Sequence, residues 1–346
     1  MRRSLLLLLL LLLPGIISCS GSQPSLHRAQ LLSLGTLVDV SLWGASPRKI
    51  TEAERIIQEE LDRIHTTLHA WQPGPLMEVN RRLAEGSWFH CPPEILPLIV
   101  QGKQLYRSSG GLFNPAMGRL VGLWGFHSDD LPGGPPPSTA EIDRFLANLP
   151  GMEAIEVKGE QIRGTNPALQ LDFGAFAKGY AVDRIIERLR TIGIRNAIIN
   201  AGGDLRAIGR HGERAWRIGI RQPRGEGVLA SLELGEDESV FTSGDYERFY
   251  IYQGRRYHHI LDPRTGSPAR GASSVTVVHR EAAEADAAAT ALFVAGPQGW
   301  QDVARRMGIE HVMLVDDKGN VWMTPAMAAR IRFETAQKPR VTISEP

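Results

Sequence analysis

The sequence contains only two cysteines among its 346 residues, which excludes a framework of disulfide bonds. It has no uninterrupted apolar run of about 18 residues or more, which excludes an ordinary transmembrane helix. Thirty-nine basic and 38 acidic residues leave a formal charge of +1, so the charge does not indicate nucleic-acid binding. With 42% hydrophobic and 22% charged residues, the chain has the composition of a globular protein whose stability comes from its core.

The amino terminus has the features of an export signal. Two arginines precede an apolar run from Leu5 to Ile17, which is shorter than the about 20 residues that cross a bilayer. The segment Ile16-Ile17-Ser18-Cys19 resembles the lipobox of bacterial lipoproteins, whose cysteine is lipid-modified after cleavage; the alternative is a short membrane anchor. We therefore predict a lipoprotein signal peptide over 1–18, a flexible tether over 19–30 that begins at lipidated Cys19, and an exported protein anchored to the membrane and facing the periplasm.

Apolar spacing predicts helices in the first half of the chain and mostly strands in the second. Helices are expected over residues 46–69, 94–109, 139–149, 175–192 and 281–295. Strands are expected over residues 34–42, 153–158, 161–163, 168–172, 196–200, 204–209, 215–221, 228–234, 248–253 and 256–261, with a hairpin around 316–319. This order predicts an α+β fold with antiparallel sheets and packed helices rather than a doubly wound parallel sheet. We expect a single domain over 31–335 and a tail over 336–346.

The segment from Leu169 to Ala181 contains the first candidate site. A predicted strand passes through Gly174 into a helix whose first turn carries Lys178. Free backbone N–H groups and a cation would converge there, which suits an anion such as phosphate. The alternative is that Asp172 is a polar cap and Lys178 a solvated helix residue.

Two further segments carry candidate side chains. Asp286 and Thr290 lie four residues apart on one face of an alanine-rich helix, and their oxygens suit Mg²⁺ or Ca²⁺ unless the spacing is accidental. His258 and His259 are adjacent in a predicted strand, so their side chains point to opposite faces and one of them at most can serve a given site. The glycines of Asn200 to Asp204 do not indicate a dinucleotide-binding fold, because a hairpin and not a helix follows them.

In their order along the chain these segments resemble the FAD:protein FMN transferase family, the ApbE-type flavin transferases formerly called thiamine biosynthesis lipoproteins. The resemblance spans nearly the whole mature chain. It rests on Leu34-Gly35-Thr36, Trp71 with Asn80, Phe113-Asn114-Pro115 running to Leu123-Trp124-Gly125-Phe126, Leu171 to Tyr180, Asn200 to Asp204, Thr242 to Glu247, His259 to Gly266, and Ala285 to Thr290.

The resemblance implies an enzyme that transfers FMN from FAD to a threonine hydroxyl of an acceptor protein and releases AMP. It implies a Mg²⁺ ion at the FAD pyrophosphate, held by the Ala175 carbonyl with Asp286 and Thr290. Contacts to FAD are implied for Leu34, Trp71, Leu112, Phe113, Asn114, Asp172, Lys178 and His259. The acceptor is expected to be a subunit of an exported or membrane-bound redox complex with a Ser/Asp-Gly-x-x-Thr-like segment.

A threonine hydroxyl is a poor nucleophile near neutral pH, so a base must take its proton. His259 and Asp172 are the two candidates, and the sequence does not choose between them. Two alternative functions share the same motifs: hydrolysis of FAD to FMN and AMP, with water in place of threonine, and flavin binding by a lipoprotein without catalysis.

Overall fold

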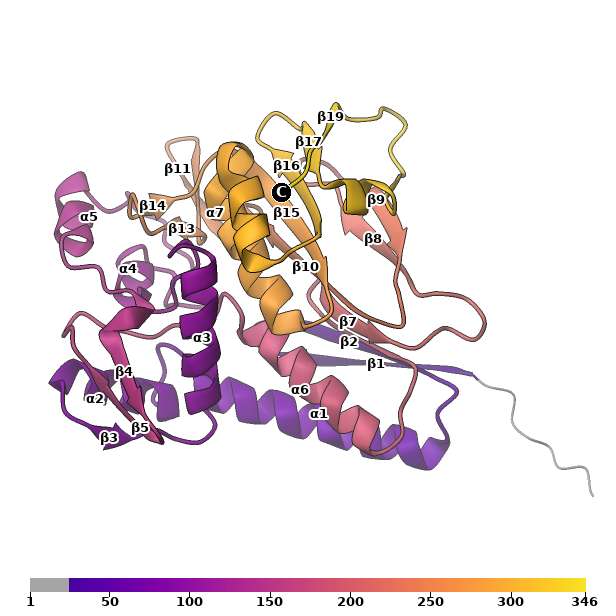
Figure 1. Ribbon diagram of the computed structural model, residues 1–346, viewed down its shortest axis with the longest axis horizontal. Coiled ribbons are helices and arrows are strands. Elements are labelled where there is room, and N and C mark those ends of the chain that lie inside the picture. The colour runs from indigo at the N-terminus through magenta and orange to yellow at the C-terminus, as the bar shows by residue number, and fades with distance from the viewer. Residues whose placement is uncertain (1–24) are drawn as a thin grey trace, which may run out of the picture.

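A nine-stranded sheet forms the centre of the computed structural model, which describes residues 25–346 (Figure 1). In spatial order its strands are β1 (Leu26–Ser33), β2 (Thr36–Trp43), β6 (Ala197–Ala201), β7 (Asp204–Ile208), β10 (Asp237–Gly244), β15 (Ala272–His279), β16 (His311–Asp316), β17 (Val321–Met323) and β19 (Val341–Ile343). Neighbouring strands are antiparallel, apart from β17 and β19, which pair in parallel.

Three long helices cover one face of this sheet: α1 (Pro47–Leu68), α6 (Ala177–Thr191) and α7 (Ala282–Met307). In α1, Ala53, Ile57 and Leu61 are buried at helical spacing, and Pro47 begins the helix because its fixed φ suits the first position. Helix α7 packs on β10 and β15 and is kinked where Gly296 precedes Pro297. The face that α6 and α7 share with the sheet contains the largest hydrophobic core.

A second layer covers the opposite face of the sheet. It contains β8 (Arg217–Arg221), β9 (Val228–Glu233), β18 (Arg332–Phe333) and the short helix α8 (Pro325–Ala328). Leu205 of β7, Val240 of β10 and Met313 of β16 are buried beneath this layer. The central strands are therefore covered on both sides, and seven of the eight residues of β15 are buried.

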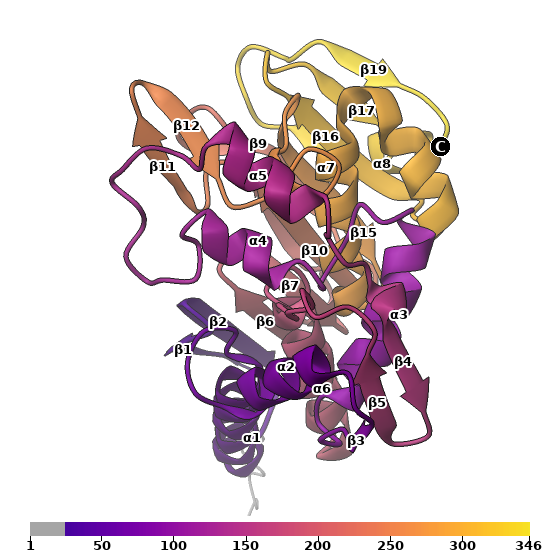
Figure 2. The same ribbon diagram turned by 90° about the vertical axis from the view of Figure 1, so that its left-hand side faces the viewer.

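The remaining elements form the part of the molecule seen best in Figure 2. They are α2 (Pro75–Glu85), β3 (Phe89–His90), α3 (Leu96–Ser108), α4 (Gly118–Leu123), α5 (Thr139–Leu146), a 3₁₀ turn (Met152–Ala154), β4 (Ile155–Lys158), β5 (Gln161–Gly164), β11 (Phe249–Tyr252), β12 (Arg255–His258), β13 (Leu261–Asp262) and β14 (Ser267–Pro268). A third core joins α4, α5 and the β11–β12 hairpin through Trp124, Phe126 and Tyr250.

The α+β fold with antiparallel sheets and the five predicted helices are confirmed. The strand predicted over 168–172 is wrong: Leu171 donates its amide to the Asn80 side chain and Asp172 donates to the Pro115 carbonyl, so no ladder forms. Strands β10 and β15 and helix α2 were not predicted.

Both predicted domain boundaries need correction. Strand β1 already begins at Leu26, within the predicted tether, because its residues pair with β2. The predicted tail over 336–346 contributes β19, which adds to the edge of the sheet beside β17. The signal peptide and Cys19 lie outside the described residues, and none of the helices within 25–346 is long and apolar enough to cross a membrane.

Candidate functional site

The first turn of α6 brings Lys178 against two carboxylates. The Lys178 ammonium pairs with Asp204, which follows the β6–β7 turn, and Asp204 also accepts the Thr242 amide at 2.9 Å. Burial by itself would lower the pKa of Lys178, but the Asp204 and Asp286 carboxylates raise it. The Lys178 ammonium therefore stays protonated and can face an anionic ligand.

Helices α6 and α7 approach each other closely beside this lysine. A Cβ atom at Gly179 would lie 2.4 Å from the Ala282 carbonyl oxygen, so glycine is required there. The Gly179 amide donates to Asp286 Oδ2 at 3.0 Å. The close approach thus fixes Asp286 next to the α6 turn that carries Lys178.

A buried aspartate of α6 holds the beginning of α7. Asp183 accepts the amides of Ala282 and Ala283, each at 2.9 Å, and pairs with Arg206, whose side chain is 3% exposed. Because no side chain of α7 caps its own first turn, Asp183 does so from the neighbouring helix. Its role was not predicted, since its partners lie about 100 residues further along the chain.

We expect Asp183→Ala to lower the free energy of unfolding by about 2–4 kcal/mol, because two buried amides lose their acceptor. Urea denaturation measures this change. Glu281→Ala is the matched control: Glu281 also contacts Arg206, at 3.4 Å, but its side chain is 43% exposed, so we expect a change below about 1 kcal/mol. Equal effects of the two substitutions would contradict the capping role.

Of the predicted metal ligands, Asp286 lies beside the Lys178 turn. Asp286 is buried, and burial raises its pKa well above the usual value although Lys178 opposes the shift. Thr290 lies one turn further along α7, with its hydroxyl 3.2 Å from that of Ser243, and Ala175 lies in the loop just before α6. Within residues 25–346 there is no group of three His, Cys, Asp or Glu side chains suited to a metal. A cation here would depend on mixed carboxylate, hydroxyl and carbonyl oxygens, a donor set that fits Mg²⁺.

Asp172 belongs to a second group of side chains. Its Oδ2 accepts from His127 Nε2 at 2.9 Å and its Oδ1 from the Gly174 amide at 2.8 Å. Burial would raise the pKa of Asp172, but the bonds from His127 and Gly174 hold it below the usual value. The His127 ring stacks on Trp71 at 5.4 Å between ring centres. His127 was not predicted, because it lies in an irregular segment where no sequence pattern marks it.

His259 lies directly after β12, and Arg248 contacts both His259 and Trp71. The backbone carbonyl of Arg248 is 3.2 Å from His259 Nδ1. The Arg248 guanidinium lies 5.9 Å from the centre of the Trp71 ring. Burial lowers the pKa of His259 to about 3, and the charges of Arg248 and Lys178 add to this effect. The imidazole is therefore neutral near pH 7, with the proton on Nδ1 and a lone pair on Nε2.

His258 has different surroundings. Its Nε2 donates to the Ala269 carbonyl at 2.9 Å, and its ring packs edge-on against Phe293 of α7 at 5.5 Å. The two histidines therefore serve different parts of the molecule, as expected. His259 itself lies in a bend directly after β12 and not within a strand, where it was predicted.

The predicted contacts Leu112, Phe113 and Asn114 lie in the protein core. Phe113 is 1% exposed and packs against Phe176, while the Asn114 amide donates to the Pro150 carbonyl. Leu34 occupies the β1–β2 turn with a φ of 52°. The structure thus gives Phe113 and Asn114 structural contacts, and a direct contact with FAD stays a prediction for all four residues.

Glu247 is a further side chain in the vicinity of Lys178 that the sequence did not single out. Burial raises its pKa, while Lys178 opposes the shift. Altogether the structure gathers Lys178, Asp204, Asp286 and Glu247 in one group, and Trp71, His127, Asp172, Arg248 and His259 in another. The charge of Lys178, in the first group, contributes to the lowered pKa of His259, in the second. They offer a cation, carboxylate oxygens, a flat aromatic surface and a neutral histidine.

Known proteins of one family are similar to this chain along most of its length. The model of the ApbE family matches residues 34–313. An FAD:protein FMN transferase of Rhodobacter capsulatus is 41% identical over 300 residues, which cover 86% of this chain and 57% of the relative, so the chain spans little more than half of that protein. The enzyme of the same name from Salmonella typhimurium is 29% identical over 302 residues, which cover 85% of this chain and 86% of the relative.

Two solved structures are similar along most of the chain. The ApbE protein of Thermotoga maritima has a TM-score of 0.79 and 32% identity, covering 89% of this chain and 100% of that one. The flavinyl transferase ApbE of Pseudomonas stutzeri, in its apo form, has a TM-score of 0.78 and 30% identity, covering 91% of this chain and 98% of that one.

Proposed function

This chain belongs to the ApbE family, and from that premise we propose that it is an FAD:protein FMN transferase acting on a threonine of an acceptor protein. The observation that carries the proposal is the grouping of Lys178 and Asp286 at the first turn of α6, together with the neutral imidazole of His259, whose pKa the Lys178 charge helps to lower. Transfer of a phosphoryl group needs these parts: charge neutralisation at the phosphate and a proton acceptor for the hydroxyl.

In the proposed reaction the threonine oxygen attacks the phosphorus of the FMN half of FAD. A new P–O bond forms to the threonine, the pyrophosphate bond breaks, and AMP leaves with the bridging oxygen. Lys178 faces the charge that collects on the phosphate oxygens, because its ammonium is held at the beginning of α6 by Asp204. Trp71, stacked on His127, offers a flat surface for an aromatic ring of FAD.

Mg²⁺ fits the oxygen donors around Asp286. Asp286 and Thr290 would hold the ion with the Ala175 carbonyl, since a buried carboxylate with a raised pKa is stabilised by a cation. When bound, the ion neutralises charge on the pyrophosphate oxygens.

His259 is the better candidate for the base. Its Nε2 has no hydrogen-bond partner among residues 25–346, whereas both carboxylate oxygens of Asp172 already accept hydrogen bonds. Asp172 instead orients His127, and through it the Trp71 ring.

We expect the affinity for Mg²⁺ to fall as the pH is lowered. A carboxyl with a raised pKa remains protonated to a higher pH, and the ion must displace that proton from Asp286. Isothermal titration with Mg²⁺ at about pH 6 and about pH 9 measures the difference, and we expect tighter binding at the higher pH. Equal affinities at the two pH values would contradict the role of Asp286.

We further propose that the protein is an exported lipoprotein anchored through Cys19 and that its acceptor is a subunit of an exported or membrane-bound redox complex. The apolar run and the lipobox-like segment before Cys19 support this proposal.

Cys19→Ala is expected to leave an unprocessed precursor that lacks the lipid, because the cysteine is the attachment point. Mass spectrometry and partitioning into the membrane fraction measure both effects. Cys91→Ala is the matched control, since Cys91 is buried within the fold. Unchanged mass and partitioning of Cys19→Ala would show that this cysteine is not modified.

Incubation of residues 19–346 with FAD, Mg²⁺ and an acceptor containing an Asp-Gly-x-x-Thr segment tests the transferase activity. We expect flavin fluorescence on the acceptor band in a denaturing gel. Release of FMN and AMP without labelling of the acceptor would instead indicate hydrolysis of FAD, and unchanged FAD would indicate flavin binding alone.

A further inference from the structure

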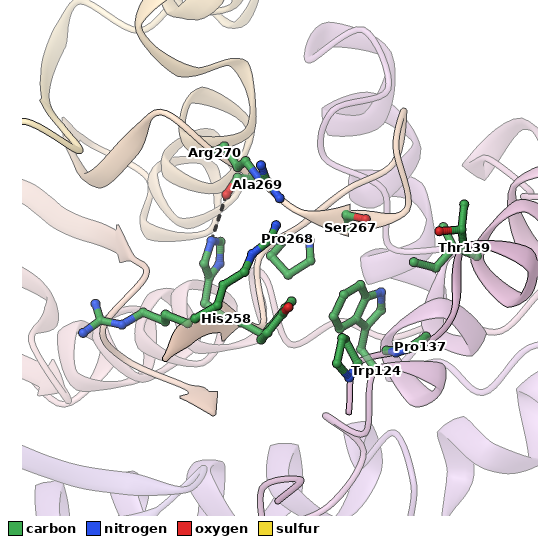
Figure 3. A pocket seen from close by; sticks show the side chains of 13 residues that line it. Trp124, Pro137, Thr139, His258, Ser267, Pro268, Ala269 and Arg270 are labelled. Atoms are coloured by element: carbon green, nitrogen blue, oxygen red, sulfur yellow. Dashed lines mark hydrogen bonds between the residues drawn. The ribbon is translucent and has the colours of Figure 1, made fainter. Parts of the chain in front are cut away.

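A separate pocket lies beside the strand that leads to His259. Its volume is about 280 Å³, and residues of β12, of β14 and its following turn, and of the stretch from Trp124 to Ile142 line it (Figure 3). We call it the β12 pocket. None of the residues assigned above to the metal, the phosphate or the base lines it, so its purpose is unexplained by the reaction itself.

The β12 pocket carries positive charge. Arg255, Arg256 and Arg270 line it, all three are exposed, and no lining residue is acidic. Arg256 contacts Asp245 at 3.3 Å, but within residues 25–346 the structure gives Arg255 and Arg270 no ion pair. Guanidinium groups bind carboxylates with paired hydrogen bonds, so the pocket is suited to an acidic ligand.

The backbone of β12 offers an open strand edge to the same pocket. Among the described strands, β12 pairs with β11 alone. The amide of His259 donates to the carbonyl of Arg248, so by the antiparallel alternation Arg256 and His258 direct their backbone groups away from β11. An exposed edge of this kind binds an extended peptide as an added strand.

Two segments connect the β12 pocket with the surroundings of the proposed base. Tyr257 and His258 line the pocket, and His259 is the next residue. Trp124 lines it as well, and two residues later Phe126 lies 6.3 Å from the His259 ring centre. Two residues of extended chain span about 7 Å. A peptide bound in the pocket would therefore need only a few further residues to reach His259.

We propose that the β12 pocket binds an acidic, extended segment of the acceptor protein close to the threonine that receives FMN. This inference rests on the proposed function, because it assigns the binding surface for the protein substrate of that reaction. Polypeptide is favoured over a small anion because the arginines share the pocket with an open strand edge and with the apolar side chains of Trp124 and Pro268.

A charge-reversal experiment tests the inference. The enzyme variant is Arg255→Glu with Arg270→Glu, and its matched control is Arg48→Glu with Arg332→Glu, two exposed arginines that do not line the pocket. The acceptors are one small domain with an Asp-Gly-x-x-Thr segment in two versions, preceded by aspartates or by asparagines. The measured quantities are kcat and KM for each acceptor at saturating FAD, and Kd for FAD from flavin fluorescence.

The reversal is expected to raise KM for the aspartate version about tenfold or more and to leave KM for the asparagine version, kcat and Kd for FAD within about twofold. The control variant is expected to behave as the wild type. An unchanged KM, an equal rise for both versions, or weaker FAD binding would overturn the docking inference while the transferase activity stands. Absence of transfer by the wild type to either version would overturn the proposed function, and the docking inference with it.

Discussion

Asp286→Ala is expected to abolish FMN transfer, lowering the rate by at least about 10³-fold, because the charged Mg²⁺ ligand is lost. The protein should nevertheless fold. Burial of the Asp286 carboxylate raises its pKa, which means that the charge costs free energy in the absence of a cation. Relief of that cost offsets part of the about 1–3 kcal/mol lost when the buried Gly179 amide loses its acceptor, so we expect the variant without Mg²⁺ to stay folded and to unfold in urea within about 3 kcal/mol of the wild type.

Asp302→Ala is the matched control for this prediction. Asp302 is in the same helix, but its side chain is 55% exposed and pairs with Arg305 on the surface. We expect its transfer rate to equal that of the wild type. Wild-type activity in excess EDTA, or full activity of Asp286→Ala, would contradict the assignment of the metal site.

His259→Ala is expected to lower the transfer rate by about 10²- to 10⁴-fold, the usual contribution of a positioned base. Steady-state kinetics at saturating FAD and acceptor measure it. His258→Ala is the matched control: its ring packs against Phe293 and donates to Ala269, so its loss should reduce stability while the rate stays within a few fold. Near-wild-type transfer by His259→Ala would leave Asp172 as the candidate base.

The pH dependence of the transfer rate distinguishes the role of His259 from that of Asp286. With a pKa of about 3, His259 is neutral down to strongly acidic pH, and the rate falls only as the pH drops through that value. The pKa of Asp286 is raised, so loss of Mg²⁺ produces an acid limb at a higher pH. Added Mg²⁺ should shift that limb to lower pH, because ion and proton compete for Asp286, whereas a limb due to His259 should not respond.

Local patterns were sufficient for much of the fold. Helix α1 repeats its apolar residues every turn, and α5 begins with Ser138 and Glu141 in a reciprocal capping box. Gly202 and Gly203, both with positive φ, form the turn of the β6–β7 hairpin. In each case residues close in sequence determine the structure.

Long-range contacts decided what local patterns missed. Strand β15 is covered on both faces, so its residues show no alternation of apolar and polar side chains. Residues 168–172 alternate but form no ladder, because the Asn80 side chain and the Pro115 carbonyl take their amide hydrogens. Strand β19 exists because β17 offers it an edge.

The same division applies to the function. By itself the sequence determined the export signal pattern, the family resemblance, and the motifs that contain Asp172, Lys178, His259 and Asp286. Only the tertiary structure decided that His127 hydrogen-bonds to Asp172 and that Asp183 caps the first turn of α7. It also decided that three arginines lie beside the open edge of β12. The physical reason is that hydrogen bonding and burial join residues far apart in the chain, and no spacing rule encodes those pairs.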